Sequence, residues 1–173
     1  MATELPEAEG GGMKKMVIVV PLAPPRELLP NNRRNGNAHW SVQAEATAAY
    51  RAAAAYAAVS QRATCGGGPI FHGPVIVSVV VTWPWSRYPG KRKMPDVDAV
   101  PTACKAAIDG IVDAVIIPDD GPETIIEIRA ASRRGKKGED GRTIIVIWEA
   151  DSDTIRGMDE CFDHSPSPLA TST

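Results

Sequence analysis

Closely spaced carboxylates are the residues of this chain best suited to do chemistry. Asp96 and Asp98 form an Asp-x-Asp pair, and a second acidic pair, Asp119-Asp120, follows after a stretch with helical periodicity. Hard divalent cations prefer oxygen ligands, and Mg²⁺ is typically held by one or two carboxylates together with substrate phosphates. We therefore expect a divalent-metal site built from the Asp-x-Asp and one carboxylate of the later pair.

Basic side chains accompany these acids. The run Lys91-Arg92-Lys93 comes directly before the Asp-x-Asp, and Lys105 lies about two helical turns after Asp98. A metal at such a site can polarise a phosphodiester and lower the pKa of a bound water. The Lys105 ammonium could then neutralise charge that develops on the phosphate. Cations beside acidic metal ligands indicate a polyanionic substrate.

The Asp-x-Asp is expected to present both side chains to one side. Pro95 precedes it and favours extended backbone, and residues i and i+2 of an extended segment project to the same face. Two such carboxylates repel each other unless a cation or a proton lies between them. This geometry favours a bound cation.

Each of these residues also has a purely structural interpretation. Asp98 could cap the helix that follows it, and Asp119-Asp120-Gly-Pro is a good plain turn. Lys105 and Asp109, four residues apart, could form a surface ion pair. The combination of both acidic pairs with the neighbouring basic run favours the metal site.

The charge distribution points to a partner rich in phosphate. The net charge is −2, but residues 1–12 carry −3 and residues 149–173 carry −5, so residues 13–148 carry +6. A basic body around an acidic pocket suits a phosphate backbone. A mixed, solvated surface is the alternative interpretation.

The elements that must position these residues can be predicted from hydrophobic patterning. Strands are expected at 16–20, 75–85, 124–132 and 143–149, and helices at 38–62 and about 100–115. The resulting β-α-β-α-β-β order predicts an α+β fold, a small mixed sheet with the helices packed on one face.

One domain is expected, over residues 13–150, between a flexible acidic leader (1–12) and a disordered acidic tail rich in Ser-Pro (151–173). No apolar run approaches the roughly 20 residues of a membrane helix, so no membrane partner is expected. The acidic N-terminus is unlike a signal peptide.

Three cysteines, Cys65, Cys104 and Cys161, have neither metal-ligand spacing nor a disulfide framework. They favour reduced thiols in an intracellular protein, with Cys104 packed in the core. Zinc ligation is not expected, because no cluster of His and Cys is in view.

A longer pattern contains these acids, and it resembles the RusA family of Holliday-junction resolvases of bacteria, prophages and phages. The pattern consists of Asp96-Val-Asp98, Lys105-Ala-Ala-Ile-Asp109-Gly-Ile and Pro118-Asp119-Asp120. The resemblance extends over roughly residues 16–148, with the segment 96–120 the most specific part. It implies a RusA-like fold, a homodimer and Mg²⁺-dependent cleavage of branched DNA, with Mn²⁺ as a possible substitute.

The resemblance also implies roles for individual residues. Asp96, Asp98 and Asp120 correspond to the Mg²⁺-binding catalytic residues, and Lys105 corresponds to a functionally needed lysine. Two departures concern the helix start: Ala99 stands where the family commonly has Asn, and about three extra residues separate Asp98 from Lys105. These departures affect the role of Lys105 more than the roles of the aspartates.

The expected function is a Mg²⁺-dependent, structure-selective endodeoxyribonuclease that resolves four-way DNA junctions in recombination and repair, in the cytoplasm of a bacterium or of a phage-infected host cell. Asp119 is expected as an alternate or outer ligand. The residues expected to contact DNA phosphates are Arg33, Arg34, Lys91, Arg92, Lys93, Arg133, Arg134, Lys136 and Lys137. One alternative is a non-catalytic protein that binds branched DNA. Another is a metal-dependent transferase acting on a sugar nucleotide, which the lack of a Gly-rich nucleotide loop disfavours.

Overall fold

The computed structural model describes residues 14–30, 40–64, 66 and 70–151 of the chain. The elements are β1 (Lys15–Val20), the 3₁₀ helix η1 (Arg26–Leu28), α2 (Trp40–Thr64), β2 (Val75–Trp83), α3 (Ala99–Asp113), β3 (Ile125–Arg134) and β4 (Arg142–Glu149). The predicted α+β class with a small mixed sheet is therefore confirmed. The predictions for the leader, for Arg33 and Arg34, and for the tail after residue 151 fall outside the described residues.

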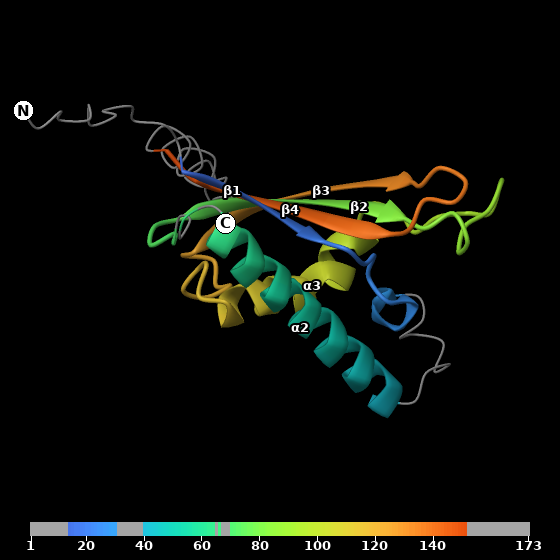
Figure 1. Ribbon diagram of the computed structural model, residues 1–173, viewed down its shortest axis with the longest axis horizontal. Coiled ribbons are helices and arrows are strands. Elements are labelled where there is room, and N and C mark those ends of the chain that lie inside the picture. Colours follow the sequence, from blue (N-terminus) through green and yellow to red (C-terminus); the bar gives the residue numbers. More distant parts are fainter. Residues whose placement is uncertain (1–13, 31–39, 65, 67–69, 152–173) are drawn as a thin grey trace, which may run out of the picture.

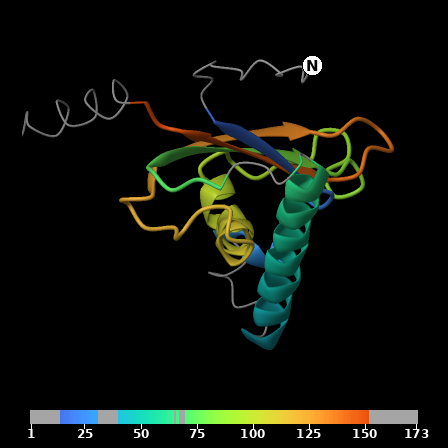
Figure 2. The ribbon, with the colours of Figure 1, turned by 60° about the vertical axis from the view of Figure 1, so that its left-hand side comes forward.

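The sheet has the strand order β1-β4-β2-β3 (Figure 1). Strand β4 is antiparallel to both β1 and β2, whereas β2 and β3 are parallel. A parallel pair requires a crossover connection, and α3 provides it. The described helices lie on one face of the sheet, as Figure 2 shows from the side.

The parallel pairing brings two loops to one end of the sheet. Strands β2 and β3 both end there, so the loop before α3 and the β3–β4 hairpin emerge side by side (Figure 1). The Gly135 amide donates to the Trp83 carbonyl at 2.8 Å, and the Trp85 amide donates to the Glu139 carbonyl at 3.4 Å. The fold thereby fixes the basic loop and the basic hairpin against each other.

Alternation of apolar side chains directs each strand toward the helices. In β1, Met16, Ile18 and Val20 are buried while the residues between them are exposed, as expected where successive side chains point to opposite faces. The predicted core role of Cys104 is confirmed, because its side chain is fully buried. Burial raises the pKa of its thiol to about 12, so this cysteine stays a neutral thiol at physiological pH. No helix in the described part of the chain is long and apolar enough to cross a membrane.

Small residues let α2 and α3 approach closely. A Cβ atom added at Gly110 would lie 2.2 Å from the Arg51 carbonyl oxygen and 3.0 Å from the Ala55 amide nitrogen. The helix pair is also joined by a two-pronged ion pair, in which Arg51 contacts Asp113 at 2.5 and 2.6 Å. This contact fixes the position of α3 against α2 one helical turn beyond Asp109.

We expect Gly110→Ala to lower the free energy of unfolding by about 1–3 kcal/mol, because the new methyl group meets the backbone of α2 and cannot be relieved by a side-chain rotation. Urea denaturation followed by circular dichroism measures this change. Gly73→Ala is the control, since a Cβ atom there would meet only Glu149 Oε1, at 3.8 Å. Equal losses of stability in the two variants would contradict the close helix contact.

Candidate functional site

The Asp-x-Asp lies at the turn that begins α3. The Ala99 amide donates to the Asp96 carbonyl and the Val100 amide to the Val97 carbonyl, both at 3.1 Å. Asp98 has helical backbone angles, φ −66° and ψ −21°. The prediction of an extended Asp-x-Asp is therefore wrong. A proline restricts the residue before it and leaves those after it free to turn.

The two carboxylates nevertheless border one cavity. Asp96 and Asp98 both line a hollow of about 630 Å³ between the loop before α3 and the segment around η1. Their proximity comes from the tight turn rather than from strand-like alternation. The two carboxylates thus share one cavity, as expected, but a tight turn and not an extended segment brings them there.

Asp98 does not serve as a helix cap. It occupies the N-cap position of α3, but its side chain makes no capping hydrogen bond, whereas a capping aspartate accepts one from the second or third helical amide. The side chain is exposed. The capping interpretation is wrong, and the Asp98 carboxylate is left for another partner.

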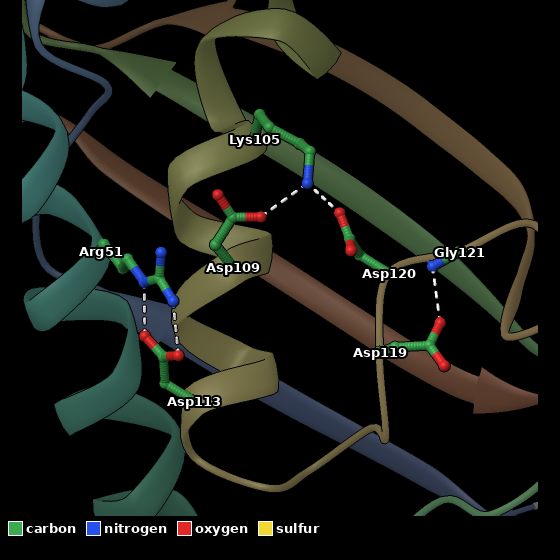
Figure 3. A network of polar contacts seen from close by, with 7 residues as sticks. All are labelled: Arg51, Lys105, Asp109, Asp113, Asp119, Asp120 and Gly121. Carbon is green, nitrogen blue, oxygen red and sulfur yellow. Dashed lines mark hydrogen bonds and ion pairs between the residues drawn. The ribbon is translucent and has the colours of Figure 1, made fainter.

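One face of α3 leads from the Asp-x-Asp toward the second acidic pair. Asp98, Thr102, Lys105 and Asp109 follow one another at spacings of four, three and four residues, and such spacings place side chains on the same helix face. Lys105 lies about 10 Å along the axis from Asp98. The ammonium of Lys105 is directed toward Asp109, one turn further along the helix, where its Nζ atom lies 2.6 Å from Asp109 Oδ1 (Figure 3).

Lys105 joins two carboxylates (Figure 3). Its Nζ atom donates to Asp109 Oδ1 at 2.6 Å and also to Asp120 Oδ2. The predicted ion pair between Lys105 and Asp109 is therefore confirmed, and Asp120 is a further partner. All three side chains are partly or well exposed, with 56%, 27% and 38% of their surface accessible.

The chain after α3 brings Asp120 to this position. Val115 adopts a left-handed conformation, φ 55°, which is unfavourable for a β-branched residue and is held only where its surroundings determine it. Ile116 is buried, and its amide and carbonyl bond to Ile111 and Phe71 at 3.2 and 3.0 Å. This anchor turns the chain back along α3, so that Asp120 meets Lys105.

Asp119 has a different role from its neighbour. Its Oδ1 atom accepts a hydrogen bond of 2.7 Å from the Gly121 amide and lies away from Lys105 (Figure 3). This is the side-chain-to-backbone bond of an Asx turn. The bond supports the interpretation of Asp119 as a turn former, with Asp120 as the member of the pair directed at the site.

The donor set fits Mg²⁺ in chemistry, since Asp96, Asp98 and Asp120 offer the carboxylate oxygens that this ion prefers. Within residues 14–30, 40–64, 66 and 70–151, no three His, Cys, Asp or Glu side chains form a group in metal-ligand geometry. The structure brings Asp96 and Asp98 to one cavity and places Asp120 on the Lys105 ammonium.

The predicted phosphate-binding residues divide into two groups at the site end of the sheet. Lys91, Arg92 and Lys93 are exposed and lie on the loop before the Asp-x-Asp. Arg134 holds this loop, because its Nη2 atom donates to the Arg92 carbonyl at 2.7 Å. Lys93 Nζ lies 3.4 Å from Asp96 Oδ2, so the basic loop directly contacts the acidic pair.

Glu139 organises the hairpin group. It accepts hydrogen bonds from the Arg133 guanidinium at 3.3 and 2.7 Å and from the Lys136 amide at 2.8 Å. The guanidinium contact, followed by the amide bond, lowers the pKa of Glu139 to about 2. Part of the positive charge that the sequence places on Arg133 is therefore balanced within the hairpin, while Lys136 and Lys137 are exposed.

Sequence reasoning missed two cations of the site. Arg26, the first residue of η1, and Arg87, in the loop after β2, both line the cavity beside Asp96 and Asp98. Neither lies in a basic run or at a motif spacing. Only the packing of η1 against the loop brings them there, so no local signal identified them.

Comparison of the chain with models of known protein families and with curated proteins finds no match. The functional assignment therefore depends on the residue pattern and on the geometry of the site.

Proposed function

We propose that this protein is a Mg²⁺-dependent endodeoxyribonuclease of RusA type that resolves four-way DNA junctions. The observation that supports it best is the line of functional groups along one face of α3. That line runs from the cavity carboxylates of Asp96 and Asp98 to the Lys105–Asp120 pair, beside the exposed basic loop.

In this proposal Asp96, Asp98 and Asp120 hold the metal. When bound there, Mg²⁺, or Mn²⁺ in its place, would act as a Lewis acid toward the phosphodiester and would lower the pKa of a bound water. Lys105 carries the positive charge that stabilises the phosphate as negative charge develops. Asp109 keeps that ammonium in place through its 2.6 Å contact. The proposed site residues thus bind, orient and neutralise a phosphodiester.

The basic loop and the hairpin tip are proposed to hold the DNA backbone. Two substitutions in the hairpin test this, because they are expected to change junction affinity in opposite directions. Lys137→Ala should weaken junction binding and make its salt dependence shallower by about 0.9 in log–log slope, the value for one lost phosphate contact. Glu139→Gln should strengthen binding, because it frees Arg133 from a charged partner. Fluorescence anisotropy over a salt series measures both. Two variants indistinguishable from the parent would exclude the hairpin from DNA binding.

A homodimer is proposed as the active assembly. A junction cut symmetrically on two strands requires two active sites, and a two-fold dimer supplies them. The sheet face opposite the helices offers an apolar surface, where Val17 and Val19 are 39% and 48% exposed and pair with Val146 and Ile144 of β4. Within the described residues, no helix covers that face (Figure 2). Light scattering should give twice the 18.4 kDa chain mass; a monomer that still makes paired cuts would contradict the dimer.

A non-catalytic junction-binding protein is the second candidate. Its support is the ion pair between Lys105 and Asp120, which gives the Asp120 carboxylate a charged partner within the protein. The two candidates differ in one result: the nuclease cuts a four-way junction with Mg²⁺ and not with EDTA, whereas the binding protein shifts the junction under both conditions and never cuts it.

A further inference from the structure

The cavity beside the Asp-x-Asp is larger than a metal site requires. Its volume of about 630 Å³ lies within the range of roughly 300–1,000 Å³ that is usual for small-molecule sites. Asp96 and Asp98 occupy only one border of it. Most of the remaining lining, including Arg26, Leu29, Arg87, Tyr88 and Met94, has no role in the proposed cleavage reaction, so the cavity has room for a further group of the substrate.

The lining combines two kinds of surface. Leu29, Tyr88 and Met94 contribute apolar or aromatic surface. Four cations also border the cavity, and these are Arg26, Arg87, Arg92 and Lys93. A nucleotide presents the complementary pair of surfaces, a flat base that stacks on apolar and aromatic side chains and a phosphate that binds cations.

The apolar part of the cavity is held firmly. Tyr88 is only 8% exposed, and its ring packs edge-on against the fully buried Trp83, with ring centroids 5.8 Å apart at 74°. The Tyr88 amide also donates to the carbonyls of Pro84 and Trp85, at 3.3 and 3.1 Å. A base that enters therefore meets a surface that is already formed.

The basic side is fixed from two directions. Arg87 donates to the Pro24 carbonyl at 2.9 Å, which joins the loop after β2 to the segment before η1. The Arg92 carbonyl accepts a bond of 2.7 Å from Arg134 of the hairpin. The lining of the cavity comes from the η1 segment, the loop after β2 and the start of α3, and these two bonds hold the loop in place beside the other parts.

We propose that this cavity binds one unpaired nucleotide of the branched DNA strand. The base lies on Leu29, Tyr88 and Met94, and its phosphate contacts Arg92 and Lys93, which places the adjoining phosphodiester at the carboxylates. This inference rests on the proposed nuclease function and adds the source of its selectivity. In an uninterrupted duplex the base must first be extruded, at a cost that is least where pairing is already broken. The cavity is therefore expected to favour a junction, in which the pairs at the crossover open more readily, over an uninterrupted duplex.

The test uses a four-way junction with 2-aminopurine at the crossover, in EDTA, so that binding is observed without cleavage. Emission from this base analogue rises when it leaves the helix stack, and the full-length protein is expected to cause such a rise. Thr102→Phe should abolish it and weaken junction binding by about tenfold, because the exposed Thr102 lines the cavity and the larger ring fills it. Ala52→Phe, at an exposed position of α2, is the matched control and should leave the rise unchanged.

A parallel titration with free 2-aminopurine deoxyribonucleoside monophosphate separates the two sources of a nucleotide. Weak or absent binding of the free nucleotide, with a clear response in the junction, supports a strand-bound nucleotide. Saturable binding of the free nucleotide with no response in the junction overturns the proposal in favour of a small-molecule site. If the protein cuts junctions but neither probe responds, the cavity assignment is wrong and the nuclease function stands. If the protein neither binds nor cuts the junction, both fail.

Discussion

Asp96→Asn should lower the single-turnover rate of junction cleavage by about 10²-fold or more and leave junction binding in EDTA nearly unchanged. The neutral amide is a poor ligand for Mg²⁺ but has almost the shape of the carboxylate. Asp96 is exposed, with 63% of its side chain accessible, so the substitution should leave folding intact. Rapid-quench assays on an end-labelled junction measure the rate, and mobility shift measures the affinity.

Asp119→Asn is the matched control for this substitution. The Asn side-chain oxygen can still accept the bond that Asp119 receives from the Gly121 amide, 2.7 Å long in the parent, so the turn should persist. We expect nearly full activity in this variant. An active Asp96→Asn protein, or equal losses in both variants, would contradict the assignment of the metal to Asp96, Asp98 and Asp120.

Lys105→Met should produce two separable effects. The maximal cleavage rate should fall by about 10²–10³-fold, because the preorganised charge that stabilises the phosphate is lost. The Mg²⁺ concentration that gives half-maximal activity should also fall. In the parent the ammonium contacts Asp120 and competes with a metal for that carboxylate. A Mg²⁺ titration at saturating enzyme separates the two parameters, and a merely structural lysine would change neither.

Arg51→Met is the control for the loss of a cation from this region. Arg51 pairs with Asp113 at 2.5 and 2.6 Å, one helical turn beyond Asp109, and Figure 3 shows this pair as separate from the contacts of Lys105. Both side chains are about half exposed, and exposed pairs contribute at most about 1 kcal/mol to stability. Unchanged cleavage is therefore expected.

A higher Mg²⁺ requirement in Lys105→Met would show that Lys105 supports metal binding instead of competing with it.

The sequence predicted those features that depend on local spacing. The alternation in β1 and the apolar stripe of α3 located a strand and a helix with only small errors at their ends. The ion pair between Lys105 and Asp109 also followed from a four-residue spacing. In each case residues a few positions apart determine the geometry, so the local residue pattern is enough to predict it.

The contacts that the sequence did not predict join residues that a turn or a hairpin brings together. Asp120 meets Lys105 because Val115 turns the chain with a positive φ and Ile116 anchors it in the core, and nothing in the residue pattern specifies that turn. The partnership of Arg133 with Glu139 depends on the hairpin geometry. The extended Asp-x-Asp failed for a local reason, since the helical turn starts immediately after Pro95.

The most direct test of the proposed function is the cleavage of an immobile four-way junction by the full-length protein. Two opposing strands are labelled in separate reactions, with Mg²⁺ or with EDTA, and a linear duplex of the same sequence is treated in parallel. We predict nicks at symmetric positions on the two strands, only in the junction and only with Mg²⁺. Cleavage that persists in EDTA, equal cutting of the linear duplex, or tight junction binding without any cut in Mg²⁺ or Mn²⁺ would contradict a metal-dependent resolvase built on Asp96, Asp98 and Asp120.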